Sequence, residues 1–553
     1  MKKQNFIKGS LILIVSAAVS KLLGAVFKIP LTNLLGGIGM SYFSCAYSLF
    51  MPVYALTVTG LSAAVAKMTA QSMALGMYEN ARRVRKTALM LFSAVGAVGS
   101  LAVIVLARPF CLYAAGIEAA ETAVIMISPS VFFGCITAVE RGYYEGMSNM
   151  YPTAVSQLAE GIVKAVTGLY LCGYVTENGD AIIKYFPHCD DVRALAAAAG
   201  ILGVTLSSVG AAIVLKIFRL FHKKNRLSGS PHLMSRGEIA HELTAIALPS
   251  GAGALVTNLT ALIDMGTVIG CIALYSGTVR VPEGVSSAEM PHFVYGSYAG
   301  IALTVFNLIP SMTNMLGKGI LPSVTEAWSG GDRKTLERGT MQALVIAALI
   351  SVPAAVGMGV LSEEILTFLF PKQTDEVALC VNSLRLLMPG MVCLCISYPI
   401  FSMLQAIGKP SAPLKIMLFG AVVKLVGNII LIPIMGADGA ALSTTLCYLL
   451  ILAAALRVYC SAAKLRPMVS PFAAVLYSGI MCGAAAYLAE SVFLDESAPP
   501  ITRILVAGAV GGTVYIASIA ILRKNVTEYR CKSYTPRCCK IFGNNCSSTE
   551  YMK

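Results

Sequence analysis

Long apolar runs alternate with short polar segments along the chain up to about residue 522. A helix needs about 20 mostly apolar residues to cross a bilayer. Runs of this kind predict fourteen transmembrane helices, at residues 8–31, 38–66, 87–107, 122–146, 152–173, 194–217, 243–275, 294–325, 339–361, 381–407, 411–435, 437–459, 470–490 and 501–522. The pattern therefore predicts an all-α polytopic membrane protein.

The polar connections differ in charge in a regular way. Lys and Arg concentrate in both termini and in the loops after even-numbered spans, as at 82–86, 223–226 and 333–334. Acidic residues dominate the opposite loops, as at Asp190–Asp191 and Glu363–Glu364. Because basic loops stay on the cytoplasmic side, we expect both termini to be cytoplasmic.

Composition agrees with a membrane protein. Of the 553 residues, 56% are hydrophobic and 13% are charged, whereas a soluble protein has about a quarter charged residues. The net charge of +14 lies in short clusters between apolar runs, so we expect no nucleic-acid partner. The 16 cysteines are scattered through the chain without dense spacing, which does not fit an extracellular disulfide framework.

A weak internal repeat is visible between the two parts of the chain. Residues 161–166 align with 421–426 at a shift of 260, and the alignment places Lys164 on Lys424. Two parallel six-helix repeats followed by two extra helices are therefore expected, with a substrate site between the repeats. The predicted units are a six-helix bundle at 1–220, a basic cytoplasmic linker at 221–242, a second bundle at 243–460, two helices at 461–522 and a basic, disordered cytoplasmic tail at 523–553.

Ionisable residues inside spans are costly and mark functional sites. The basic ones are Lys21, Lys28, Arg141, Lys164, Lys318 and Lys424, and the acidic ones are Glu140, Glu145, Glu160 and Asp264. Several cations that converge on one cavity would bind a phosphate or diphosphate and repel a cationic drug. We therefore expect Lys21, Lys28, Arg141, Lys164, Lys424 and Asp264 to form the substrate-binding site.

The partners of these charges are predicted from helical spacing. Arg141 with Glu145, and Glu160 with Lys164, are i,i+4 pairs that can neutralise each other on one helix. Lys424 has no carboxylate on its own span. Its partner is Asp264, another acid from a different helix, or an anionic substrate. Lys28 is also placed well for snorkelling to the membrane interface.

Catalytic and metal sites are not indicated. The chain has no Walker motif and no nucleophile–base constellation, and its loops are too short for a soluble catalytic domain. The tail cysteines lack the Cys-x2-Cys spacing of a zinc site. We expect no enzyme activity and no cofactor, and coupling to Na⁺, H⁺ or the membrane potential is left open.

Two motifs resemble a known family, the stage V sporulation protein B family. They are Ser20-Lys-Leu-Leu-Gly24 and the stretch Arg141-Gly-Tyr-Tyr-Glu-Gly-Met-Ser-Asn-Met-Tyr-Pro-Thr-Ala-Val-Ser-Gln157, followed by Glu160. The resemblance covers nearly the whole chain. It implies the MATE-like (MOP) superfamily fold, with twelve plus two helices, and Lys21 and Lys28 stand on the helix that carries cavity arginines in related lipid II flippases.

The resemblance also implies a function. The protein would be a flippase of the bacterial plasma membrane that moves an undecaprenyl-diphosphate-linked cell-wall or polysaccharide precursor, such as lipid II, to the outer leaflet by alternating access. Its partners would be the lipid-linked oligosaccharide, the bilayer and the cell-wall synthesis machinery. The alternatives are a cation-coupled multidrug exporter of the same fold, a membrane-embedded sugar transferase or polymerase, and a non-catalytic scaffold.

Overall fold

The structure is a computed structural model, and it describes residues 6–533 apart from 186–190, 222–232, 276, 278–281, 283–284, 466–469 and 494–497. This part of the chain is helical throughout its regular elements and contains no strand. Intrahelical hydrogen bonds satisfy the backbone without water, which is what the bilayer interior demands of a long apolar chain.

The first part of the chain begins with a very long helix, α1 (Phe6–Tyr54), followed by a π-helical turn, η1 (Ala55–Thr59). The helices after it are α2 (Leu61–Ala74), α3 (Tyr78–Pro109), α4 (Glu121–Ile127), α5 (Pro129–Gly146), α6 (Tyr151–Glu177), α7 (Gly179–Ile182) and α8 (Val192–Phe221). Short turns η2 (Phe110–Ala115), η3 (Glu118–Ala120) and η4 (Ile183–Tyr185) join some of them.

The second part begins with another long helix, α9 (Arg236–Ile272), which a Ser235–Glu238 capping box starts. The next elements are α10 (Met290–Ser297), the π-helical turn η5 (Tyr298–Ala302), α11 (Leu303–Phe306) and α12 (Leu308–Ser329). They are followed by α13 (Arg333–Val360), α14 (Ser362–Leu369), α15 (Thr374–Ala406), α16 (Ser411–Met435), α17 (Ala437–Ala463), α18 (Ser470–Phe493) and α19 (Pro500–Ser533).

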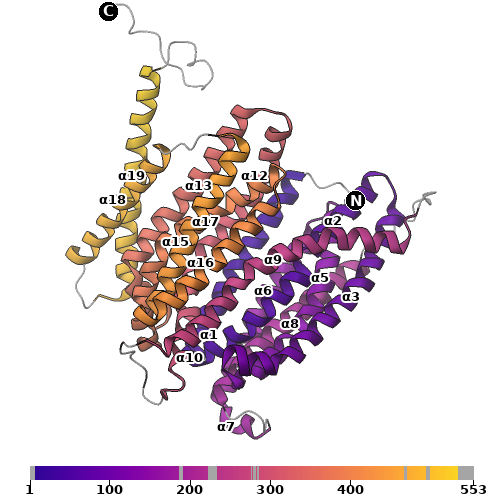
Figure 1. The fold of residues 1–553 in the computed structure, drawn as a ribbon, viewed down its shortest axis with the longest axis horizontal. Helices are drawn as coiled ribbons and strands as arrows, with labels where there is room; N and C mark the ends of the chain where they lie inside the picture. Colours follow the sequence, from indigo (N-terminus) through magenta and orange to yellow (C-terminus); the bar gives the residue numbers. More distant parts are fainter. Residues whose placement is uncertain are drawn as a thin grey trace, which may run out of the picture.

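The helices form two adjoining groups (Figure 1). The indigo to magenta group contains α2, α3, α5, α6 and α8, and the orange group contains α12, α13 and α15 to α17. α1 packs against α6 and α8 of the first group and against α10 of the second, so it joins the two. The yellow helices α18 and α19 lie outside the orange group and pack against α13 and α14.

The number of spans differs from the predicted fourteen. Eleven stretches of the described residues are long and apolar enough to cross a membrane, or twelve if a pair bent by 47° at residue 307 forms one span. The predicted spans 8–31 and 38–66 lie mostly in one helical stretch, Val15–Ala74, of 60 residues, which would extend for about 90 Å if straight. Gly36, which has a non-helical conformation, interrupts this stretch between the two predicted spans. The count of fourteen therefore stays a prediction.

The limits of the predicted units also shift. The linker expected at 221–242 is not loop throughout, because α9 begins at Arg236. Ile239, Leu243 and Ala247 of α9 pack in a cluster with α2, α3 and α5 of the first group. The tail expected from 523 begins as helix, because α19 continues to Ser533, and residues beyond it lie outside the described part.

Corresponding helices of the proposed repeats make similar pairs. α6 packs on α8 as α16 packs on α17, and α3 packs on α5 as α13 packs on α15. α1 meets α6 as α9 meets α16. These pairs are those that two parallel six-helix repeats require, although the repeat itself stays a prediction.

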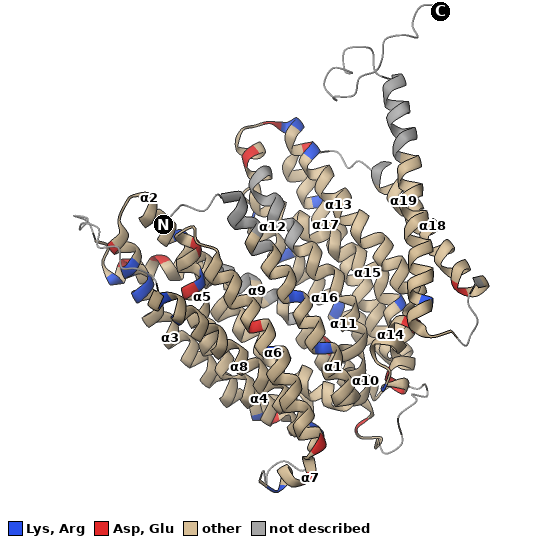
Figure 2. Cartoon of the chain, turned by 180° about the vertical axis from the view of Figure 1, so that it is seen from behind, with Lys and Arg blue, Asp and Glu red and all other residues tan. Residues whose placement is uncertain are grey.

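The outer surface of the bundle is apolar along the helices. Figure 2 shows mostly uncharged residues on the helix flanks, with charged residues gathered near the helix ends. α16 exposes Phe419, Val422, Val426, Ile430 and Ile434. Large exposed apolar side chains on consecutive turns would be unfavourable in water and indicate contact with lipid.

Candidate functional site

A cavity of about 1300 Å³ lies between the two helix groups. Its wall comes from α1, η1, α2 and α6 on one side and from α9 to α12 and α15 to α17 on the other. It reaches from Lys28 and Tyr295 as far as Gln405, Pro410 and Ser411, at the turn between α15 and α16. The charged residues among the described lining are Lys28, Lys164, Lys424 and Asp264.

Lys28 projects from α1 into this cavity. Its ammonium donates a hydrogen bond of 3.1 Å to the Ala299 carbonyl. Ala299 belongs to η5, where π-helical geometry interrupts the usual i→i−4 bonding. One turn farther along α1, the Thr32 hydroxyl donates to the Gly300 carbonyl at 3.3 Å. Lys28 is therefore held inside the protein by the second helix group, and it does not reach out to the membrane interface.

Lys164 enters the same cavity from α6. Its ammonium donates to the Tyr47 hydroxyl at 3.1 Å. It also lies 4.9 Å from the centre of the Phe27 ring and 5.5 Å from that of Tyr47, so aromatic faces stabilise the cation. None of the described ion pairs joins Lys164 to Glu160, so the prediction from helical spacing that these two residues neutralise each other is wrong.

Glu160 pairs instead with Arg141 of the neighbouring helix. The Arg141 guanidinium donates to the Glu160 carboxylate at 2.7 Å and to the Ser156 hydroxyl at 2.9 Å. This pair also replaces the predicted Arg141–Glu145 interaction within α5. The spacing rule fails here because α5 and α6 bring carboxylate and guanidinium closer across the helices than along either one.

Lys424 is bonded to Asp264, which is one of the alternatives that the sequence left open. The ammonium lies 2.6 Å from Asp264 Oδ2, and both residues are buried, with 3% and 4% of their surface exposed. Asn428 donates to Asp264 Oδ1 at 3.2 Å and to the Thr267 hydroxyl at 2.7 Å. The carboxylate thus cancels the charge of Lys424 and joins α9 to α16.

The predicted site is therefore divided. Lys28, Lys164, Lys424 and Asp264 line one cavity, whereas Lys21 and Arg141 are not among its lining residues. Lys21 is exposed on α1, and the side chain of Lys318 lies outside what the structure describes. Because Asp264 neutralises Lys424, the net positive charge of the described cavity wall comes from Lys28 and Lys164.

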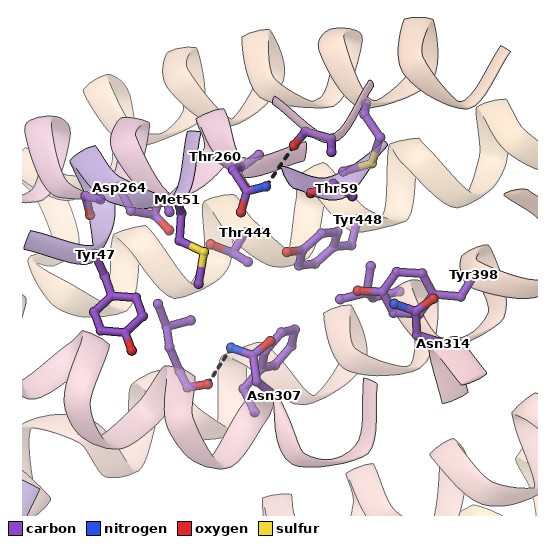
Figure 3. Close-up of a pocket in the computed structure, with 18 of the residues that line it drawn as sticks. Tyr47, Met51, Thr59, Thr260, Asp264, Asn307, Asn314, Tyr398, Thr444 and Tyr448 are labelled. Atoms are coloured by element: carbon purple, nitrogen blue, oxygen red, sulfur yellow. Dashed lines mark hydrogen bonds between the residues drawn. The ribbon is translucent and has the colours of Figure 1, made fainter. Parts of the chain in front are cut away.

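Neutral lining residues were missed by the sequence analysis. They include four tyrosines, three asparagines and a glutamine: Tyr47, Tyr295, Tyr398, Tyr448, Asn258, Asn307, Asn314 and Gln405. Figure 3 shows several of them directed into one space. A search restricted to ionisable residues overlooks them, although the i, i+4, i+7 spacing of Tyr398, Ser402 and Gln405 indicates one polar face in an apolar helix.

Curated relatives match most of the chain. The lipid II flippase MurJ of Bacillus subtilis is 24% identical over 461 residues, which is 80% of this chain and 80% of the relative. Stage V sporulation protein B of the same organism is 25% identical over 505 residues, covering 88% of this chain and 90% of that protein.

Solved structures share the fold. Lipid II flippase MurJ in an inward closed conformation has a TM-score of 0.65 at 16% identity and covers 93% of this chain and 100% of its own. An inward-facing multidrug resistance MATE family transporter of the MOP superfamily has a TM-score of 0.61 at 16% identity. The match covers 82% of this chain and 99% of the transporter. At these identities the two structures define the fold alone.

Two family models cover different parts of the chain. The model described as lipid II flippase MurJ matches residues 297–502. The model described as polysaccharide biosynthesis protein matches residues 6–328, which is more than half of the chain. This match shows that the chain belongs to the polysaccharide biosynthesis protein family, and its fold is similar to that of the MATE transporter.

Proposed function

We propose that this protein is a flippase for an undecaprenyl-diphosphate-linked precursor of the cell wall or of a polysaccharide, with lipid II as the leading candidate. The observation that carries the proposal is the pair of cavity lysines, Lys28 and Lys164, which have no carboxylate partner among the described residues. Ammonium groups held by carbonyl, hydroxyl and aromatic partners keep their positive charge available for a diphosphate.

The arrangement of the two helix groups fits alternating access. The described polar contacts between the groups include Lys28 with Ala299, Asn33 with Leu369, and Arg193 with Glu289. These contacts lie toward the end of the molecule where α10 begins. The cavity extends toward the opposite end, at the turn between α15 and α16, so this conformation supports substrate entry from that side.

The positive-inside rule assigns the entry side to the cytoplasm. In this orientation the headgroup enters from the inner leaflet while the polyprenyl chain stays in lipid. Asp180→Cys should then react with an impermeant thiol reagent on intact cells, and Lys334→Cys only after permeabilisation, both in a version without other cysteines. The opposite labelling pattern would reverse the direction of transport.

Export of cationic drugs is the alternative function for this fold. The described cavity wall carries three lysines against one aspartate, and that aspartate is already bonded to Lys424. A cationic drug would therefore meet net repulsion in the cavity.

The test is flipping in proteoliposomes with a fluorescent undecaprenyl-diphosphate-linked sugar. A hydrogen bond to a charged group contributes about 1.5 to 3 kcal/mol, so we expect Lys28→Gln and Lys164→Gln each to reduce flipping roughly tenfold to a hundredfold. Lys216→Gln is the control, because Lys216 is exposed on α8 and does not line the cavity. Wild-type flipping by both cavity variants, or transport of a cationic dye in place of the lipid, would contradict the proposal.

A further inference from the structure

The cavity has two ends of different chemistry. Lys28 and Lys164 gather near Tyr47, to which Lys164 is bonded. In Figure 3, Tyr47 lies at one end of the cavity, Tyr398 and Asn314 lie at the other, and Tyr448, Thr444 and Asn307 lie between them. The far end contains hydroxyls, amides and aromatic rings, and the described residues there include no charged side chain.

We call the far end together with the middle of the cavity the neutral subsite and define it by Asn307, Asn314, Tyr398, Ser402, Gln405 and Tyr448, all of which line the cavity. Tyr398, Ser402 and Gln405 share one face of α15, since residues i, i+4 and i+7 of a helix project in the same direction. Asn307 and Asn314 come from the bent segment of α11 and α12. With Tyr448 of α17, three parts of the helical bundle thus supply polar groups to an apolar membrane region, where such groups are costly without a ligand.

Asn307 presents a defined hydrogen-bonding group to this space. Its side-chain nitrogen donates to the Leu303 carbonyl at 2.7 Å, as the dashed line in Figure 3 shows. A carbonyl oxygen only accepts, so the bonded atom must be the amide nitrogen. The amide oxygen accepts no hydrogen bond from the described residues, so it is an acceptor for a ligand that carries hydroxyl or N–H donors.

Aromatic rings form the other part of the subsite. Tyr448 stacks on Phe306, with ring centres 6.0 Å apart and an interplanar angle of 10°. Tyr398 is partly exposed, and Phe401 lines the same wall. Tyrosine offers a flat apolar face together with a hydroxyl, which suits a sugar ring, because a sugar has apolar C–H faces and hydroxyls around its edge.

The cavity is also large enough for both parts of such a ligand. Its volume of about 1300 Å³ exceeds the roughly 300 to 1000 Å³ of sites for drug-sized molecules. A diphosphate alone would leave most of this space to water.

We infer that the neutral subsite binds the carbohydrate of the lipid-linked headgroup, while the diphosphate lies against Lys28 and Lys164. This inference rests on the proposed function and adds to it an orientation and a specificity site. The lysines recognise the part that all such lipids share, and the neutral subsite distinguishes a lipid that carries sugar from one that does not.

The experiment compares the binding of two probes to the purified full-length protein. One is undecaprenyl diphosphate, and the other is the same lipid bearing a disaccharide. We expect the wild type to bind the disaccharide lipid at least tenfold more tightly. Tyr398→Ala and Asn314→Ala should each weaken its binding about fivefold, the effect of one neutral hydrogen bond, and change the binding of undecaprenyl diphosphate less than twofold. Lys28→Gln should weaken both lipids equally.

Controls separate these effects from misfolding. Tyr170→Ala removes an exposed tyrosine of α6 that does not line the cavity, and it should change neither affinity. Tyr398→Phe keeps the ring and should retain most of the preference if stacking dominates. Equal binding of the two lipids by the wild type, or equal losses for both lipids in Tyr398→Ala and Asn314→Ala, overturns the inference but leaves the proposed flippase intact. Failure to bind either lipid overturns both.

Discussion

At the scale of single residues, the ion pair between Lys424 and Asp264 is the most deeply buried one described. Both side chains are buried, and Asn428 donates a hydrogen bond to Asp264. Removing one partner from such a pair leaves an uncompensated charge in a region of low dielectric, whereas removing both does not. The pair is therefore expected to serve stability first, in contrast to Lys28 and Lys164, which have no carboxylate partner among the described residues.

A double-mutant cycle tests this role. Asp264→Asn and Lys424→Gln should each destabilise the protein by about 3 to 5 kcal/mol, and the double variant should be more stable than either single one. The measurement is thermal unfolding in detergent, with Lys415→Gln as a control for an exposed lysine of the same helix. Additive losses in the double variant would show that the two residues act independently.

At the scale of elements, α1 and α10 cross with almost no space between them. Gly36 has a φ of 64°, which breaks α1 and favours glycine. The Gly37 amide, freed by this break, donates to the Glu376 carboxylate at 3.1 Å. A Cβ on Gly37 would lie 2.6 Å from Ser297 Oγ, and one on Gly296 would overlap the Gly37 carbonyl oxygen. Small residues thus permit the backbone contact that joins the two helix groups.

We therefore expect Gly296→Ala to push the two helices apart and to cost about 1 to 3 kcal/mol, as overpacking generally does. Gly173→Ala in α6 is the matched control, because a Cβ there meets nothing within 4 Å. Thermal unfolding of both variants checks the difference. Equal stability of the two variants would mean that the α1–α10 crossing adjusts without strain.

At the scale of the whole molecule, one end of the interface between the helix groups is closed by a charged cluster. Arg193 at the start of α8 bonds both Asp191 and Glu289, and Tyr42 donates to Asp191 at 2.9 Å. Glu289 immediately precedes α10, so this cluster connects the two groups. For an alternating-access transporter, these contacts have to break before the cavity opens on this side.

This closure should depend on pH. Burial raises the pKa of Glu289, but the Ser286 amide and the Arg193 guanidinium outweigh it and bring the pKa below its ordinary value. A lowered pKa in the closed form means that the contact is fully present above the ordinary carboxyl pKa and is lost as the pH falls through the lowered one. Spin labels at positions 180 and 363 should therefore report an unchanged distance from pH 7 to 5 and a longer one at lower pH.

The Arg193→Gln variant should show the longer distance already at pH 7, and Lys184→Gln in the same loop region should behave as the wild type. A distance that increases between pH 7 and 5 in the wild type would contradict the role of Glu289. An unchanged distance in Arg193→Gln would show that apolar packing alone closes this end.

The sequence by itself determined the class of fold and which ionisable residues lie inside the apolar spans. A run of 20 or more mostly apolar residues in a bilayer forms a helix, because only a helix satisfies all backbone hydrogen bonds within one segment. The motif around Arg141 was sufficient to indicate the family. Lys28, Lys164, Lys424 and Asp264 were identified as cavity residues because ionisable groups are rare inside spans.

Only the tertiary structure decided which charges neutralise each other. The i,i+4 rule predicted that Glu160 pairs with Lys164. In the structure α5 packs against α6, so Glu160 forms its ion pair with Arg141, and Lys164 donates a hydrogen bond to Tyr47. Lys424 looked unpaired on its own helix, but α9 supplies Asp264. Spacing along one helix describes only neighbours on that helix, whereas a charge in a low-dielectric interior pairs with whatever carboxylate the packing brings nearest.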